Sequence, residues 1–156
     1  MKSLWFKVTP LLIFLFLAAA CSTPLKLTNV LITITDYRPT TNESKANLKL
    51  HLSNENVFPL AIGGITGKLY LEGNYVGNFE ISKAIGIPRL GAVDREAELQ
   101  IEKPAIIQKL RASSAPSISY RLDNKLHMEV SEERSNSSTE AKGQIDSAWL
   151  RAEPVK

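Results

Sequence analysis

The chain is 156 residues long, with 44% hydrophobic residues, 22% charged residues and a formal net charge of +3. This is the length of one domain, with enough apolar residues for one modest core. The single cysteine excludes an intrachain disulfide framework and any zinc site built from several cysteines. After the first twenty residues, 17 basic side chains stand against 16 acidic ones, a balance that gives no electrostatic basis for binding nucleic acid.

The first twenty residues have the features of a secretory signal peptide. Lys2 and Lys7 form a positive N-terminal region, and residues 11–20 are an unbroken apolar run. At about 1.5 Å of helical rise per residue, such a run covers only part of the hydrocarbon thickness of a bilayer. We therefore expect residues 1–20 to be removed by processing rather than to stay as a transmembrane helix.

Small residues and the only cysteine follow this run directly. The segment Leu17 to Cys21 reads LAAAC and resembles the lipobox of bacterial lipoproteins, with Ala18 where a leucine is usual. The resemblance implies that the signal is cut before Cys21 and that this residue carries three acyl chains, which anchor a protein stably. Because Ser22 rather than an aspartate follows, it also implies the outer membrane of a two-membrane bacterium, facing the periplasm. The alternative is an unlipidated exported protein, cleaved near Ala20.

Short segments of alternating apolar and polar residues, separated by turn residues, predict β-strands in the rest of the chain. The expected strands are residues 25–37, 46–53, 68–72, 76–82, 93–101, 118–122, 126–130 and, at the end, 145–150. Loops are expected at 36–44, 54–64 and 132–139, and a turn is expected at Asp123–Asn124.

One hairpin and one helix stand out among these elements. Gly73-Asn74-Tyr75 lies between two expected strands; a two-residue Gly-Asn turn is possible, but a three-residue loop places Leu69 opposite Phe79 and is the preferred interpretation. Pro104 suits the first position of a helix that ends by residues 113–114, and an apolar stripe follows it at helical spacing: Ile106, Ile107 and Leu110. About seven strands, one short helix and no strand–helix alternation predict an all-β, antiparallel β-sandwich.

The segment from Leu48 to Phe79 carries a family resemblance. An alternating strand ends in Asn54-Glu55-Asn56, a short apolar stretch with Pro59 follows, and Gly64 precedes a hairpin centred on Gly73. This order resembles the type 2 family of late embryogenesis abundant (LEA) proteins, also called the WHy domain, whose Asn-Pro-Asn has glutamate in the middle here. The looser matches are residues 87–91 and 119–123. The resemblance covers roughly residues 25–130 and implies an immunoglobulin- and fibronectin III-like sandwich with a role in desiccation or other stress tolerance.

These features predict four parts of the chain. They are a lipoprotein signal peptide (1–20), a lipidated tether (21–24), a LEA type 2 domain (25–150) and a C-terminal tail (151–156). Apart from the lipidation site Cys21, the motif residues are expected to have structural roles. Asparagines at strand ends bond the nearby backbone, and glycines permit turns and bulges. These motif residues are Asn54, Asn56, Pro59, Gly64, Gly73 and Gly77.

Polar residues that could perform chemistry have simpler explanations as solvated strand residues. The candidates are two histidines and one alternating acidic row: His51, His127, Asp94, Glu96 and Glu98. The histidines have no metal-ligand spacing, no Gly-x-Ser-x-Gly motif is present, and Leu69 stands where a phosphate-binding loop after Gly63-Gly64 needs serine or threonine. We therefore predict no catalytic residue, no metal and no cofactor.

Three functional hypotheses follow. The first is a non-enzymatic, lipid-anchored protein that binds the membrane through Cys21 and protects envelope components or protein clients under stress. The second is an accessory lipoprotein that docks one envelope protein partner by adding a strand to a sheet edge. The third, a lipid or glycan bound between the sheets, requires an apolar cavity there.

Overall fold

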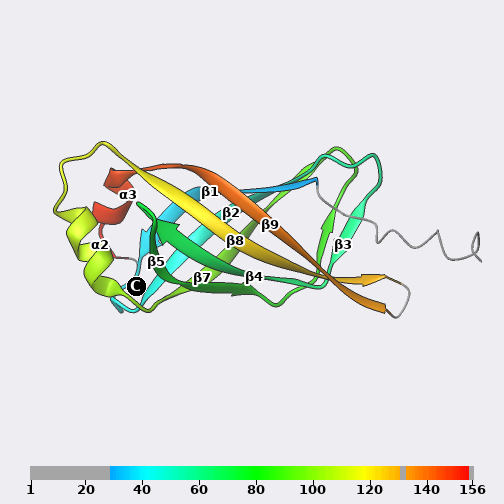
Figure 1. The fold of residues 1–156 in the computed structure, drawn as a ribbon, viewed down its shortest axis with the longest axis horizontal. Coiled ribbons are helices and arrows are strands. Elements are labelled where there is room, and N and C mark those ends of the chain that lie inside the picture. Colours follow the sequence, from blue (N-terminus) through cyan, green and yellow to red (C-terminus); the bar gives the residue numbers. More distant parts are fainter. Residues whose placement is uncertain (1–28, 131–132, 155–156) are drawn as a thin grey trace, which may run out of the picture.

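The computed structural model describes residues 29–130 and 133–154, an all-β fold with two short helices at one end (Figure 1). The predicted signal peptide, tether and Cys21 lie outside the described residues. The strands and helices, in chain order, are β1 (Val30–Pro39), β2 (Lys45–Asn54), β3 (Leu60–Ile62), β4 (Gly64–Leu71), β5 (Asn74–Ile81), β6 (Ile85–Ile87), β7 (Ala92–Ile101), α2 (Pro104–Arg111), β8 (Ser117–Val130), β9 (Glu133–Asp146) and α3 (Ser147–Arg151).

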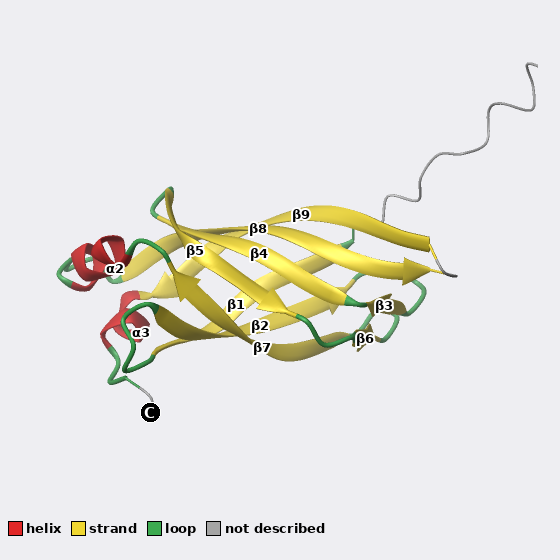
Figure 2. Ribbon diagram, turned by 90° about the horizontal axis from the view of Figure 1, so that it is seen from below, coloured by secondary structure: helices red, strands yellow, loops and turns green. Residues whose placement is uncertain are grey.

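Seven strands form one antiparallel sheet in the order β1-β2-β7-β5-β4-β8-β9, and β3 and β6 form a second, small one. The large sheet folds over on itself, so that β1, β2 and β7 face β5, β4, β8 and β9 (Figure 2). The two layers are joined where β5 pairs with β7 over only four residue pairs, from Gly77↔Ile101 to Glu80↔Glu98. The predicted all-β antiparallel class is confirmed.

The core lies between these layers and is mainly aliphatic. Strand β2 shows the physical reason, because its apolar residues alternate and all point inward: Ala46, Leu48, Leu50 and Leu52. The opposite layer contributes Leu69 and Leu122, which are also fully buried. The expected helix, α2, covers one end of the core with Ile107, and α3 adds Leu150. The third hypothesis needs an apolar cavity between these layers, and the described residues there form one cluster of buried, mainly aliphatic side chains.

Gly77 lies at the junction of the layers and has no room for a side chain. A Cβ atom at this position would sit 2.0 Å from the carbonyl oxygen of Gln100 on β7. The backbones of β5 and β7 approach closely here because glycine leaves this space empty.

The first expected loops are shorter in the structure than predicted. Strand β1 continues through Asp36 to Pro39, and a bulge between Ile34 and Asp36 turns Tyr37 into the core. Within the region 54–64, residues Leu60–Ile62 form β3, which pairs with β6 through contacts such as Leu60↔Ile87. The sequence pattern did not predict the end of β1 or the strand β3, because a bulge and pairing with a distant strand leave no periodic pattern.

The predicted hairpin is present, but its turn and register differ. Glu72 and Gly73 form a two-residue turn with φ angles of 46° and 74°, the positive values that a tight type I′ turn requires. Leu69 faces Gly77 rather than Phe79, because the two-residue turn changes the pairing and a bulge between the pairs Tyr70↔Tyr75 and Leu69↔Gly77 shifts it by one residue more. The three-residue loop is therefore wrong.

The C-terminal third of the chain differs most from the structure expected from the sequence. Asp123–Asn124 is not a turn, since β8 runs without a break from Ser117 to Val130. Residues 133–139 of the Ser/Asn-rich segment predicted as a loop are part of β9, which pairs with β8 over fourteen residue pairs. The long ladder of backbone hydrogen bonds outweighs the low strand preference of these residues. After Asp146, whose side chain accepts the Ala148 N–H at 2.7 Å, the chain forms α3 instead of a strand.

Candidate functional site

The two asparagines of the family motif form a buried hydrogen-bonding centre at the end of β2. Asn54 is 1% exposed, and its Nδ2 donates to the carbonyl oxygens of Phe58 at 2.9 Å and Pro88 at 3.0 Å. Its Oδ1 accepts from the backbone N–H of Asn56 at 2.9 Å and from Asn56 Nδ2 at 2.8 Å. We call this pair of side chains the asparagine clasp, because it joins loop 55–59 to loop 88–91.

Backbone hydrogen bonds extend the clasp to a third segment. The Asn54 N–H donates to the carbonyl of Gly91 at 2.8 Å, and the Leu90 N–H donates to that of Asn56 at 3.1 Å. The carbonyl of Asn29, the first described residue, accepts the Glu55 N–H at 2.9 Å. The sequence suggested the local bonds of Asn54 and Asn56, but the bonds to residues 88–91 depend on pairing distant in sequence.

The other motif residues lie at turns and strand starts. Pro59 is exposed directly before β3, and Gly64 opens β4, where a Cβ would approach the carbonyl oxygen of Ile81 to 2.9 Å. Gly73 is in the hairpin turn, and Gly77 is at the junction of the layers. These glycines and the proline are spread along the domain and do not converge on one site.

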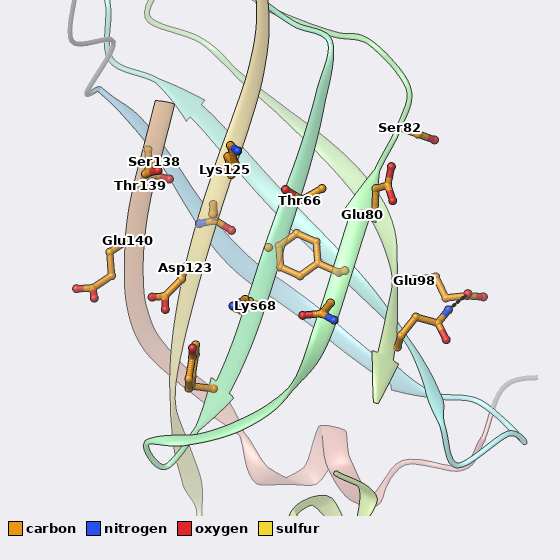
Figure 3. Close-up of a pocket in the computed structure, with 16 residues that line it drawn as sticks. Thr66, Lys68, Glu80, Ser82, Glu98, Asp123, Lys125, Ser138, Thr139 and Glu140 are labelled. Carbon is orange, nitrogen blue, oxygen red and sulfur yellow. Dashed lines mark hydrogen bonds between the residues drawn. The ribbon is translucent and has the colours of Figure 1, made fainter. Parts of the chain in front are cut away.

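A groove of about 1150 Å³ lies on the outer face of β7, β5, β4, β8 and β9 (Figure 3). Two rows of outward-facing side chains line it, and each row contains one residue from each of the five strands. One row is Ser138, Lys125, Thr66, Glu80 and Glu98. The other row is Glu140, Asp123, Lys68, Asn78 and Gln100. We call these ten side chains the polar groove.

The charges of the polar groove are only partly satisfied within the molecule. Glu98 accepts from Lys45 Nζ at 2.9 Å, and the hydrogen bond from Lys142 lowers the pKa of Glu140. By contrast, three charged side chains of the groove form no hydrogen bond or ion pair with any described residue, and these are Lys68, Glu80 and Lys125. The groove therefore exposes unpaired positively charged donors and an unpaired negatively charged acceptor.

Sequence reasoning missed the polar groove because it depends on strand register. Residues 123–124 and 132–139 were expected to be a turn and a loop, yet both regions supply groove side chains from β8 and β9. The only available signal was the alternation of polar residues along each strand, which does not specify which strands are neighbours.

The two histidines lie apart, on different layers of the sandwich. His51 on β2 contacts Asp94 on β7, with Nδ1 2.8 Å from Oδ1, and hydrogen bonds from His51 and Lys49 lower the pKa of Asp94. His127 on β8 instead contacts Thr66 at 3.2 Å, and its Nδ1 lies 2.8 Å from Asn136 Oδ1. Among the described residues no three metal-ligating side chains gather, and no helix is long and apolar enough to cross a membrane.

No protein-family model and no curated protein sequence matches this chain. Among solved structures, it is similar to AT1g01470 from Arabidopsis thaliana at a TM-score of 0.53 and 15% identity, over 78% of this chain and 79% of that one. A protein from Archaeoglobus fulgidus is more distant, with a TM-score of 0.47 and 13% identity over 77% of this chain and 96% of that one. A protein proposed to be a LEA protein has a TM-score of 0.44 and 14% identity over 83% of this chain and 74% of that one. At such identities, the first of these likenesses shows a shared all-β fold only.

Proposed function

We propose that the protein is a non-enzymatic, lipid-anchored envelope protein of the LEA type 2 class, which protects envelope components during desiccation or other stress. The lipobox-like segment at Cys21 and the motif order from Asn54 to Gly77 support this assignment. The observation that carries the protective role is the polar groove with its unpaired side chains.

The physical basis is replacement of water. When water is removed, headgroups and exposed backbone groups lose hydrogen-bond partners, and an unpaired polar group costs about 1–3 kcal/mol. Lys68 and Lys125 can donate to phosphate or carbonyl oxygens, and Glu80 can accept from amines or amides. A groove that spans five strands, at about 4.8 Å per strand, offers these groups over roughly 20 Å. A lipid anchor would keep this surface close to the membrane that it protects.

The test is a drying experiment on vesicles that carry the lipidated protein and enclose a fluorescent dye. We expect less dye leakage after drying and rehydration than with the same mass of an inert lipidated protein. Equal leakage would contradict direct protection.

A triple variant, Lys68→Ala, Glu80→Ala and Lys125→Ala, tests the groove itself. Because these side chains have no partner among the described residues, the fold should be retained within about 0.5 kcal/mol per site, and protection should fall. The matched control removes two lysines and one glutamate that are exposed elsewhere: Lys83, Lys109 and Glu153. Equal protection by both variants would exclude the groove as the protective surface.

One structural observation favours the docking alternative. Residues 92–97 of β7 pair with β2, whereas β5 pairs only with residues 98–101, so that part of the edge of β7 has no strand beside it in the described chain. An extended segment of a partner protein could add a strand there. Stoichiometric, saturable capture of one envelope protein, lost when Arg95 is replaced by proline, would favour docking over general protection.

A further inference from the structure

Large apolar side chains are exposed at one end of the described molecule. Val57 is 74% exposed, Phe58 39% and Leu90 68%, and the only other exposed large apolar side chain among the described residues is Leu31, near the start of β1. Val57 and Phe58 belong to loop 55–59, and Leu90 belongs to loop 88–91. We call Val57, Phe58 and Leu90 the apolar tip. Single exposed apolar residues are ordinary, but a cluster on adjoining loops indicates a contact surface.

The apolar tip is held in place rather than loosely attached. The asparagine clasp bonds the carbonyls of Phe58 and Pro88, and the Leu90 N–H bonds the carbonyl of Asn56. Leu90 has a φ of +48°, a left-handed conformation that leucine rarely adopts. A strained backbone that presents an exposed leucine is unfavourable in the isolated domain, which points to a partner outside it.

The chain arrives from Cys21 at this same end. Asn29 bonds Glu55 through its carbonyl, and β1 starts beside the loops that flank β3, away from the helices (Figure 1). Eight residue steps separate Cys21 from Asn29, and they span at most about 29 Å when fully extended. A domain held by lipid on Cys21 is therefore kept with this end within that distance of the membrane.

We propose that the apolar tip inserts into the surface of the bilayer that holds the acyl chains of Cys21, an inference that rests on the lipid anchoring in the proposed function. Apolar side chains of peripheral proteins enter the boundary between headgroups and acyl chains to a depth of about 5–10 Å. The exposed Arg89 beside Leu90 can pair with lipid phosphates at that depth. The insertion brings the end of the domain that carries loops 55–59 and 88–91 to the bilayer surface and places the helices at the far end (Figure 1).

A second protein copy fits this tip less well. A stable protein interface covers about 800 Å² on each partner, commonly with 20–30 residues. The apolar tip has three apolar side chains on two loops, flanked by the charged Glu55 and Arg89. A soft lipid surface accommodates such a small patch without a complementary cavity.

The experiment places a fluorescent label on the tip of the full lipoprotein. Acylation consumes the thiol of Cys21, so Val57→Cys introduces the only free thiol, at a position where the side chain is exposed. The matched control is Ala105→Cys, exposed on α2 at the opposite end. Each labelled protein is reconstituted into phosphatidylethanolamine–phosphatidylglycerol vesicles, with and without a lipid that carries a quencher near the headgroup.

We expect the label at residue 57 to shift to shorter emission wavelengths and to lose intensity with the quencher lipid, while the label at residue 105 does neither. If the protein floats with the vesicles but neither label loses intensity with the quencher lipid, the tip does not insert. The lipid anchoring itself still stands in that case. A label at residue 57 that is shielded from aqueous quencher but not quenched by lipid would show a protein contact and overturn the proposal. If the wild-type protein does not float with the vesicles and its Cys21 thiol reacts, the anchoring is wrong and the tip proposal fails with it.

Discussion

Replacing Asn54 by alanine should destabilise the domain far more than the loss of one polar side chain usually does. The side chain makes four hydrogen bonds of 2.8–3.0 Å, two donated to the carbonyls of Phe58 and Pro88 and two accepted from Asn56. A longer contact of 3.4 Å reaches the carbonyl of Ile87. All of them converge at a residue that is 1% exposed.

The expected magnitude follows from these bonds. Each hydrogen bond contributes about 1 kcal/mol net, and a partner left buried without a bond costs about 1–3 kcal/mol. Some of the freed groups lie in loops that can open to water, which limits the loss. We therefore expect Asn54→Ala to lower the free energy of unfolding by about 3 kcal/mol.

Urea unfolding of the chain from residue 21, with Cys21→Ser, measures this loss. With a slope of about 1–3 kcal/mol per molar urea, the midpoint should fall by roughly 1–3 M. Asn47→Ala is the control, because Asn47 is exposed on the same strand and its side chain makes no hydrogen bond with a described residue. If Asn54→Ala changes the midpoint no more than Asn47→Ala does, the clasp does not hold the loops and the reasoning is wrong.

Three further outcomes are expected. Gly77→Ala should lower the free energy of unfolding by about 1–3 kcal/mol, because its Cβ would lie 2.0 Å from the Gln100 carbonyl oxygen. Gly86→Ala, whose Cβ would have nothing within 4 Å, should lower it by less than about 0.5 kcal/mol. Thermal unfolding measures both losses, and equal losses would contradict the close approach. Burial raises the pKa of Tyr37 from 10.0 to about 12, so the native state holds this proton more tightly and stability should decline as the pH rises from about 10 to 12. Because the Tyr37 hydroxyl is buried without a partner among the described residues, Tyr37→Phe should abolish that decline with no loss of stability at neutral pH, as unfolding at several pH values would show. The Asp94 carboxyl should titrate below its usual pKa of 3.8 by NMR, and His51→Ala should raise its pKa; no change would show that the His51 contact is not formed in solution.

The strands with regular alternation could be predicted from the sequence, and those that depend on distant partners could not. Residues 46–52 alternate in type and in burial, so β2 follows from its own pattern. Strand β9 contains few apolar residues, and it exists because β8 offers a complete ladder of hydrogen-bonding groups beside it. The bulges that turn Tyr37 inward and shift Leu69 to Gly77 also leave no mark in the residue pattern.

The same distinction applies to the candidate sites. Asn54 and Asn56 could be identified from the family pattern, but their bonds to the loop at 88–91 needed the paired structure. The polar groove combines side chains from five strands, so it could not be derived before the register was known. The exposure of Leu90 depends on its left-handed backbone, which the sequence Pro88-Arg89-Leu90-Gly91 does not specify.

Anchoring through Cys21 is the claim on which both the protective role and the inserted tip depend. The most direct test is the intact mass of the mature protein from a bacterial host, with the Cys21→Ser variant in parallel. We predict a mature chain that begins at Cys21, carries the added mass of three acyl chains and separates with membranes, while the variant stays uncleaved or leaves the membrane. A mature chain with an unmodified Cys21, or a cleaved Cys21→Ser variant that still separates with membranes, would contradict lipid anchoring.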